Sequence, residues 1–264
     1  MDAWQALNTE LDAWAACGEI ADLWWRDDDA VAAGPKLDQL LSLTETSGLL
    51  LAVIPARAEE ELAHAVKAAP HVKVAQHGYA HINHAEKGQG QGAWELGLHR
   101  GERVVLDELD LGRRRLEALF DDKFIPVIVP PWNHIDAALL APVAARGYSG
   151  VSGFGPRCEA GYGAGHNISL PHNFTIVNSH CDLIRWKTGA KFRGATKTIN
   201  QLVEHLQARR MHTVDASEPT GYLTHHIDMD REGWEFSEQL LENINAHQAA
   251  RWCNDLVRVF GGKS

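Results

Sequence analysis

The stretch Leu23-Trp24-Trp25-Arg26-Asp27-Asp28-Asp29 is an apolar run that ends abruptly in three carboxylates. Adjacent aspartates repel one another, and nothing in the formation of a strand favours them there. A bound cation or a shared proton would relieve the repulsion, whereas an acidic loop or a helix cap is the purely structural alternative. The stretch therefore predicts a strand whose C-terminal end carries either a functional site or an acidic turn.

Similar apolar runs recur along the chain and alternate with helical patterns. Strands are predicted at residues 22–28, 49–56, 72–78, 126–132, 148–154, 174–180 and 221–226. Helices are predicted at residues 36–47, 59–69, 96–120, 136–146, 196–211 and 236–252. Such alternation implies parallel strands joined by right-handed crossovers.

The positions of polar residues at the strand ends distinguish a barrel from an open sheet. Acidic and histidine residues follow the first, third, sixth and seventh predicted strands. In a barrel these ends converge on one mouth, whereas in an open sheet the first and last would lie far apart. We therefore predict an α/β fold in which residues 1–264 form one domain, a barrel of about seven parallel strands.

The segment Gln76-His77-Gly78-Tyr79-Ala80-His81 places two histidines four residues apart directly after a predicted strand. If His81 lies on a turn that follows the strand, both imidazoles can face one point and hold a divalent metal. Gly78 would allow the backbone to turn sharply between them. Two unrelated surface histidines are the structural alternative.

Three further motifs follow predicted strands. Pro130-Pro131-Trp132 ends a strand and places Trp132 at the mouth, either as an apolar wall for a small group or in ordinary packing. Asp182 and Trp186 follow the sixth strand, where a polar loop is the alternative. The seventh strand ends in His225 and His226, one of which is a candidate general acid or base, unless it is simply a half-exposed histidine.

Composition limits the classes of partner. The 45% hydrophobic and 23% charged residues are typical of a folded globular protein, and a net charge of −10 argues against nucleic-acid binding. No apolar segment reaches the roughly 18 residues of a membrane span, and the N-terminal residues lack the basic start of a signal peptide. Four widely spaced cysteines argue against a disulfide framework. We expect a cytoplasmic protein with no membrane span.

In this order, the motifs resemble those of the polysaccharide deacetylases, which include chitin, chitooligosaccharide and peptidoglycan deacetylases. The resemblance runs from about Leu23 to His226 and rests on the motifs Asp28-Asp29, His77…His81, Pro130-Pro131-Trp132, Asp182…Trp186 and Leu223-Thr224-His225. It implies a distorted barrel. It also implies that Asp29, His77 and His81 bind one divalent metal ion, zinc or alternatively cobalt, nickel or manganese. Asp28 would then be the general base, His225 the general acid and Asp182 the carboxylate that orients His225, while Pro131, Trp132 and Trp186 would contact the substrate.

Two departures from the family pattern are visible. The arginine that usually precedes the proline–aromatic motif, where it holds the catalytic aspartate, is Val129 here; Arg26, Arg157 or Arg185 are the candidates to replace it. The aspartate pair could also be Asp27-Asp28 instead of Asp28-Asp29.

The expected activity is metal-dependent hydrolysis of a carbon–nitrogen bond, namely deacetylation of an N-acetylated sugar or small glycan. The expected partner is thus a small-molecule or oligosaccharide substrate. One alternative is another carbon–nitrogen hydrolase on the same barrel, acting on cyclic amides or ureides. The other is a barrel that binds a glycan without turning it over.

Overall fold

The computed structural model describes residues 2–86, 92–157 and 170–261. Its centre is a curved sheet of parallel strands. The strands of this sheet are β1 (Ala21–Ala30), β2 (Leu49–Val53), β3 (Val72–His77), β4 (Phe124–Val129), β5 (Gly150–Val151), β6 (Thr175–Ile176), β7 (Cys181–Asp182), β10 (Thr220–Thr224) and β11 (Ala250–Trp252). The path of the sheet is β6-β5-β4-β3-β2-β1-β10-β7, and β11 pairs with the start of β1. This arrangement confirms the predicted distorted barrel, with eight strands along the path where about seven were expected.

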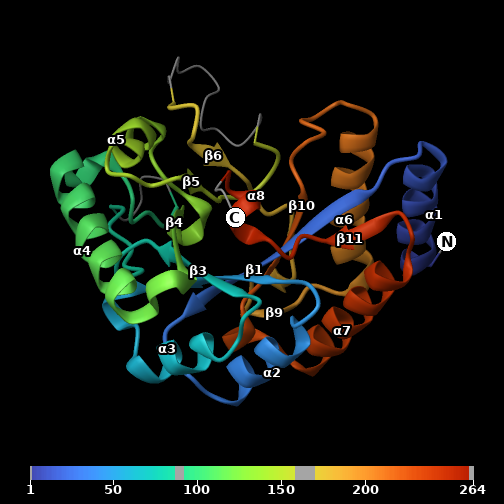
Figure 1. The fold of residues 1–264 in the computed structure, drawn as a ribbon, viewed down its shortest axis with the longest axis horizontal. Coiled ribbons are helices and arrows are strands. Elements are labelled where there is room, and N and C mark those ends of the chain that lie inside the picture. Colours follow the sequence, from blue (N-terminus) through green and yellow to red (C-terminus); the bar gives the residue numbers. More distant parts are fainter. Residues whose placement is uncertain (1, 87–91, 158–169, 262–264) are drawn as a thin grey trace.

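Helices surround the sheet on its outer side (Figure 1). They are α1 (Ala3–Ala16), α2 (Pro35–Leu43), α3 (Glu60–Lys67), α4 (Glu102–Phe120), α5 (Leu140–Ala145), α6 (Ala195–Arg210) and α7 (Arg231–Ala246). The short helix α8 (Leu256–Val259) packs instead against the opposite face of the sheet. None of the described helices is long and apolar enough to cross a membrane.

Three features of the secondary structure differ from the prediction. Helix α1 was not expected; it packs on α6, and Glu10 pairs with Arg210 across the two helices. The predicted helix 236–252 ends at Ala246, and its last residues form β11 instead. An antiparallel pair, β8 (Ile184–Arg185) and β9 (Lys191–Phe192), lies between β7 and α6. Its strands are too short to show a period in the sequence.

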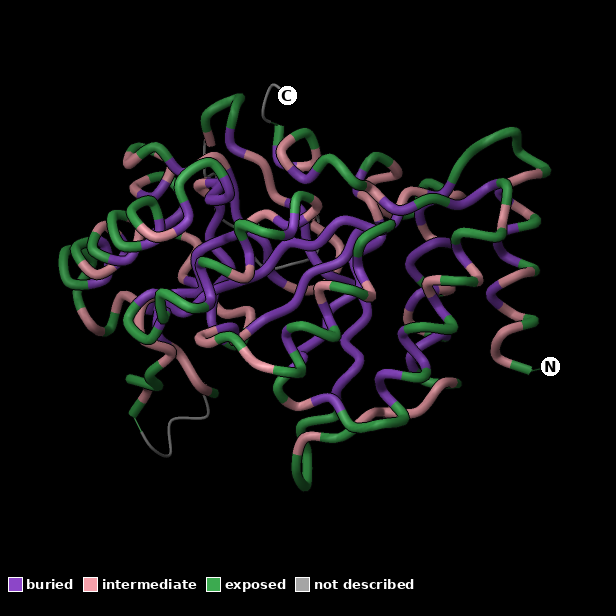
Figure 2. Tube along the Cα trace, turned by 60° about the horizontal axis from the view of Figure 1, so that its bottom comes forward, coloured by how far each residue is buried: buried purple, intermediate pink, exposed green. Residues whose placement is uncertain are grey.

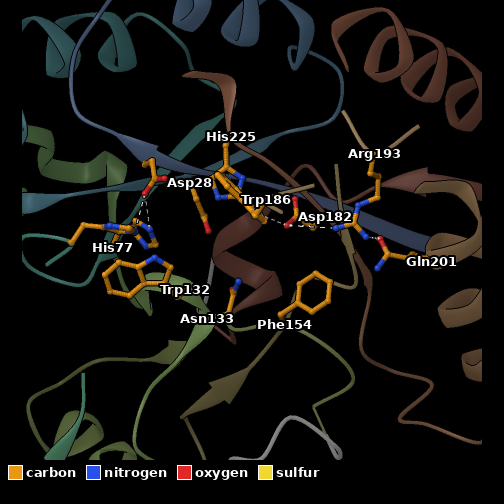
Figure 3. Close-up of a pocket in the computed structure, with 12 residues that line it drawn as sticks. Asp28, His77, Trp132, Asn133, Phe154, Asp182, Trp186, Arg193, Gln201 and His225 are labelled. Carbon is orange, nitrogen blue, oxygen red and sulfur yellow. Dashed lines mark hydrogen bonds and ion pairs between the residues drawn. The ribbon is translucent and has the colours of Figure 1, made fainter. Parts of the chain in front are cut away.

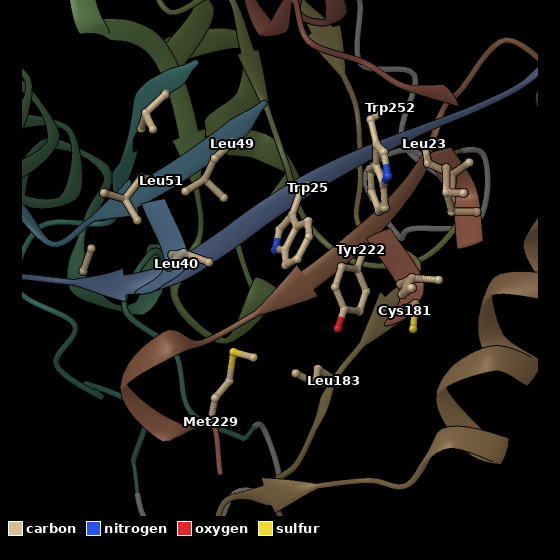
Figure 4. Close-up of a cluster of buried hydrophobic side chains, with 14 of the residues drawn as sticks. Leu23, Trp25, Leu40, Leu49, Leu51, Cys181, Leu183, Tyr222, Met229 and Trp252 are labelled. Atoms are coloured by element: carbon tan, nitrogen blue, oxygen red, sulfur yellow. The ribbon is translucent and has the colours of Figure 1, made fainter. Parts of the chain in front are cut away.

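The strands are buried on both faces, which explains their nearly continuous apolar runs. Figure 2 shows the buried strands at the centre and the exposed outer sides of the helices around them. Toward the helices, Trp25 of β1 packs edge-on against Tyr222 of β10 with ring centres 4.9 Å apart (Figure 4). On the other face of β1, Trp24 packs edge-on against Phe260, which follows α8. Packing on both faces fixes β1 at the centre of the sheet.

The register of β1 against β2 shifts between Asp27 and Ala30, and Asp29 adopts a left-handed backbone with φ of 70°. A bulge of this kind re-aims side chains at a strand end. Residues that would otherwise alternate between the two faces can therefore point to the same side.

Candidate active site

A pocket of about 660 Å³ opens at the C-terminal ends of the strands (Figure 3). Its walls come from β1, β3, β7, α6 and the segments that follow β3, β4, β5, β8, β9 and β10. The lining residues are Asp28, Asp29, His77, His81, Trp132, Asn133, Phe154, Asp182, Trp186, Arg193, Gln201 and His225. Eight of the nine site residues predicted from the sequence are among them, and the ninth, Pro131, is buried nearby.

Asp29, His77 and His81 meet at one point of this pocket. The Nε2 atoms of His77 and His81 lie 3.1 and 3.2 Å from the same Asp29 oxygen. The other ring nitrogen of His77 lies 2.9 Å from the Val129 carbonyl oxygen, to which it donates as an N–H. That hydrogen bond fixes the tautomer in which Nε2 carries the lone pair.

The three groups fit a bound cation. With His77 in this tautomer, its Nε2 lone pair and a carboxylate oxygen face each other, so a proton or a metal ion must lie between them. Ligand atoms of a tetrahedral zinc site lie about 3.4 Å apart, given Zn–N bonds near 2.1 Å. Burial acts to raise the pKa of Asp29, but when His77 carries a proton on both nitrogens its hydrogen bond and its charge hold that pKa below the usual range. The arrangement therefore suits one divalent metal ion.

The turn between the two histidines is supported from behind by Glu95. Its carboxylate accepts hydrogen bonds from the backbone N–H groups of Ala80 and His81, and it is fully buried. Burial raises the pKa of Glu95. Gly78 has a φ of +56°, and a Cβ there would lie 2.2 Å from a Glu95 oxygen and 2.5 Å from Pro131. The sequence expectation for Gly78 therefore has a steric basis, and Pro131 contacts this turn.

Left-handed backbone conformations gather at the pocket. Of the seven described non-glycine residues with positive φ, four line it: Asp29, His81, Trp132 and Asn133. Such conformations cost of order 1–3 kcal/mol each and persist where the surrounding structure enforces them. Their concentration here is typical of a functional site.

Arg26 holds the carboxylate of Asp28 with two contacts. Its Nε lies 2.9 Å from one Asp28 oxygen, and one of its terminal nitrogens donates to the other at 3.0 Å. Arg26 is completely buried, and it also donates to the Asn133 side chain at 2.6 Å. The other two candidate arginines lie elsewhere: Arg157 pairs with Asp215, and Arg185 contacts Thr188.

The remaining aspartate of the triplet, Asp27, has a separate set of partners. Asp27 is completely buried and accepts hydrogen bonds from the Thr224 hydroxyl and from the backbone N–H of His226. Its second oxygen lies 2.5 Å from Nδ1 of His226. Burial opposes protonation of His226, but the Asp27 charge raises its pKa above the ordinary value. Asp27 thus joins the end of β1 to the end of β10.

His225 lines the pocket, and the edge of its ring contacts Trp186 with ring centres 4.6 Å apart. Asp182 accepts a hydrogen bond from the Trp186 indole N–H at 2.9 Å and another from the backbone of Ile184. Among the described residues, Nδ1 of His225 is buried without a hydrogen-bond partner. Asp182 therefore reaches His225 through Trp186.

Trp132 and Trp186 are 40% and 47% exposed and form apolar walls of the pocket. Trp132 also contacts the His81 ring, with centres 4.4 Å apart. Four lining residues were not anticipated from the sequence: Asn133, Phe154, Arg193 and Gln201. Asn133 adjoins a quoted motif and Phe154 ends the predicted strand 148–154, whereas nothing in the sequence around Arg193 and Gln201 signals their position at the pocket.

A second group of ligand-type residues, His180, His205 and Glu218, is buried outside this pocket. Nδ1 of His180 accepts the backbone N–H of Gly221 at 2.9 Å, so its Nε2 carries the hydrogen and has no lone pair for a metal. The rings of His180 and His205 stack with centres 3.3 Å apart. This tautomer is the opposite of that of His77, so the group is not suited to hold a metal ion.

No protein-family model and no curated protein sequence matches this chain. Solved structures do match it. A Mycobacterium smegmatis protein, provisionally described as a polysaccharide deacetylase, has a TM-score of 0.59 and 13% identity, with 93% of each chain covered. The family 4 carbohydrate esterase from Streptomyces lividans has a TM-score of 0.52 and 14% identity, covering 88% of this chain and 91% of that one. The chitin deacetylase from the fungal pathogen Colletotrichum lindemuthianum has a TM-score of 0.51 and 12% identity, covering 93% and 89%. At these identities the similarity establishes a shared fold.

Proposed function

We propose that this protein is a metal-dependent hydrolase that removes the acetyl group from an N-acetylated sugar or small glycan. The observation that carries the proposal is the convergence of Asp28, the Asp29–His77–His81 group and His225 in one pocket. A base, a metal-binding group and an acid in one pocket are what hydrolysis of an unreactive amide requires. The names of the structural neighbours, two deacetylases and a carbohydrate esterase, point in the same direction.

Asp29, His77 and His81 would hold the divalent metal through one carboxylate and two imidazole ligands. Zinc suits this donor set, and cobalt, nickel and manganese are the alternatives. When bound, such an ion lowers the pKa of a water molecule and polarises the acyl carbonyl.

Asp28 is proposed to take the proton from the attacking water. The two contacts from Arg26 fix the orientation of its carboxylate, and Asn133 fixes Arg26 in turn. The family's usual arginine is replaced by Val129 in this chain. The buried Arg26 of β1 contacts the carboxylate of Asp28 instead. This contact favours an active enzyme over a barrel that only binds glycans.

His225 is proposed to give a proton to the departing amine, which would otherwise be too basic to leave. The contact of its ring with Trp186, held by Asp182, fixes its orientation in the pocket. Asp182 is therefore a positioning residue that acts through Trp186. Trp132, beside His81, would enclose the small acyl group.

Acetate release tests the proposal. The purified protein would be assayed with a panel of N-acetylated sugars and short oligosaccharides, before and after removal of metal with a chelator. We expect release that is lost on chelation and restored by zinc or another divalent ion, together with about one bound metal per chain. A His77→Ala/His81→Ala variant with unchanged metal content would contradict the metal site, and a well-folded, metal-loaded protein without release from any substrate would contradict the activity.

A further inference from the structure

The side of the pocket away from the metal-binding group carries a fixed positive charge. Figure 3 shows Arg193 and Gln201 across the pocket from His77. Arg193 follows β9 and precedes α6. One terminal nitrogen of its guanidinium donates to the Gln201 side-chain oxygen at 2.7 Å, and the other donates to the Ile184 carbonyl at 2.9 Å. Two neutral acceptors thus hold the guanidinium in place without cancelling its charge.

Arg193 and Gln201 still have N–H groups to offer. Each terminal nitrogen of Arg193 uses one of its two hydrogens in these contacts, so each keeps one N–H group for a ligand. Because the Gln201 oxygen is used by Arg193, its amide nitrogen is the part left for a ligand. Both side chains therefore present donors and no acceptor.

The nearest carboxylate does not use up these donors. Asp182 lies 3.9 Å from a terminal nitrogen of Arg193, which is beyond hydrogen-bond distance. Both Asp182 oxygens already accept hydrogen bonds, from Ile184 and from Trp186. At that distance Asp182 offsets part of the guanidinium charge and leaves its free N–H groups available.

The surrounding chain segment is basic although the protein as a whole is acidic. Residues 183–203 contain no Asp or Glu. They contain Arg185, Lys187, Lys191, Arg193 and Lys197. The lysines of this segment and Arg185 are exposed, in a chain whose net charge is −10. Of these five, only Arg193 lines the pocket. The other four add positive charge to the same chain segment, and this favours an anionic ligand near it.

We propose that the substrate carries an anionic group, a carboxylate or a phosphate, which binds to Arg193 and Gln201 while the acetamido group lies at the metal-binding side. The inference rests on the proposed function and narrows its substrate class to acidic N-acetylated sugars. A guanidinium held by neutral partners is preorganised for a carboxylate or a phosphate. Arg193 is then a specificity-determining residue and takes no part in the chemical step.

Matched pairs of sugars test this proposal. N-acetylglucosamine would be compared with its 6-phosphate and with N-acetylmuramic acid, which separate the phosphate and carboxylate sources. Acetate release gives kcat/KM, and calorimetry with the Asp28→Asn variant gives Kd without turnover. We expect at least one acidic sugar to exceed the neutral one about tenfold in both quantities, and the advantage to shrink as salt screens the charge.

The substitution Arg193→Gln should remove most of that advantage, so kcat/KM should fall about tenfold further for the acidic sugar than for the neutral one. Arg231→Gln is the charge-matched control, because Arg231 is 84% exposed on α7 outside the pocket; it should keep the preference. Equal use of neutral and acidic sugars, or an equal loss for both in Arg193→Gln, would overturn the inference while acetate release upholds the proposed function. Arg193-dependent binding of an acidic sugar without any release of acetate would uphold this inference and contradict the proposed function. If Arg193→Gln does not fold, a preference of the wild-type protein that is insensitive to salt would overturn the inference.

Discussion

Asp27, Asp28 and Asp29 are adjacent in the sequence, yet each carboxylate has a different set of partners. Asp27 contacts His226, Asp28 contacts Arg26, and Asp29 contacts two histidines. The mutual repulsion of the three carboxylates is therefore relieved at each residue separately, by a different cation or proton donor. This division favours Asp28-Asp29 as the functional pair over Asp27-Asp28, because Asp27 is enclosed and does not line the pocket.

The substitution Asp28→Asn should abolish turnover and leave the metal in place. Asparagine keeps the shape of the side chain but cannot accept the proton from water, so we expect kcat to fall about 10²- to 10⁴-fold. Acetate release and elemental analysis of the same sample measure the two properties. Asp27→Asn is the matched control and should mainly lower stability, because it weakens the contact with His226. Activity that survives Asp28→Asn and is lost in Asp27→Asn would move the pair by one residue.

The substitution His225→Ala should affect amides more than activated esters. An amine needs a proton to depart, whereas a phenolate leaves unaided. We expect a loss of about 10²- to 10⁴-fold in kcat/KM on the amide and a far smaller loss on an aryl acetate. His226→Ala removes the imidazole that contacts the buried Asp27, so it should lower stability and change both substrates alike. Equal losses for His225→Ala would leave His225 a binding or structural residue.

At the scale of elements, the sequence predicts the longer strands and their ends closely because both carry strong signals. The predicted strands 148–154 and 174–180 are instead the two-residue β5 and β6, and β7, which carries Asp182, was not predicted. The run before Asp27 and the run before His77 appear as β1 and β3 with nearly the predicted bounds. The bulge in β1 has no signature of its own, since only the paired strand β2 reveals the shift in register. Asp28 and Asp29 both reach the pocket because of that bulge, which strict alternation would not allow.

Contacts between distant segments could not be predicted in the same way. Glu95 supports the turn after β3 from a segment with no recognisable motif, and Arg193 enters the pocket from the end of β9. Arg26 was one of three candidate partners for Asp28, and only the packing of β1 selects it. Long-range hydrogen bonds of this kind depend on tertiary arrangement, which a single sequence does not encode by spacing.

The turn Gly78–His81 should tolerate no side chain at its first position. In Gly78→Ala the new Cβ would meet Glu95 and Pro131, and the φ of +56° is unfavourable for alanine. We expect metal affinity to fall at least about tenfold, because the substitution would displace His81 or the Glu95 carboxylate that supports its turn, and the loss of such a support lowers metal affinity by that factor. Gly18→Ala is the control, since Gly18 has a φ of +72° with nothing within 4 Å. Equal metal affinity in the two variants, measured by competition with a chelator, would show that the turn does not position the ligand.

At the scale of the whole molecule, the fold brings together residues that are almost 200 positions apart. Asp28 and His225 meet because β1 and β10 are parallel neighbours, with Asp27 aligned to Thr224. The Asp27–His226 contact ties these two strand ends just below the pocket. His180 and His205 are buried outside the pocket, where burial lowers the pKa of both. Their burial has a consequence for the stability of the entire chain.

The folded protein should lose stability in mild acid because of this buried histidine pair. Burial and the nearby Arg209 lower the pKa of His180 from 6.5 to about 3, and burial and His180 lower the pKa of His205. Above the ordinary histidine pKa, both histidines are neutral in the folded and in the unfolded chain, so their protonation does not affect the free energy of unfolding. As the pH falls from about 6.5 toward 3, the unfolded chain takes up protons that the folded chain cannot, so the free energy of unfolding decreases by up to about 1.4 kcal/mol per pH unit for each histidine.

The substitution His205→Phe isolates this effect, because phenylalanine keeps a ring stacked on His180 and cannot take up a proton. Urea unfolding at a series of pH values should then show a shallower slope between about pH 6.5 and 4, by up to about 1.4 kcal/mol per unit. The absolute stability at neutral pH is free to change, since the contact of His205 with Thr220 is lost; only the slope is diagnostic. His64→Gln, at an exposed position on α3, is the control and should keep the wild-type slope. A slope in His205→Phe equal to that of the control would mean that His205 takes up its proton in the folded protein, and His205 would then not be a source of acid sensitivity.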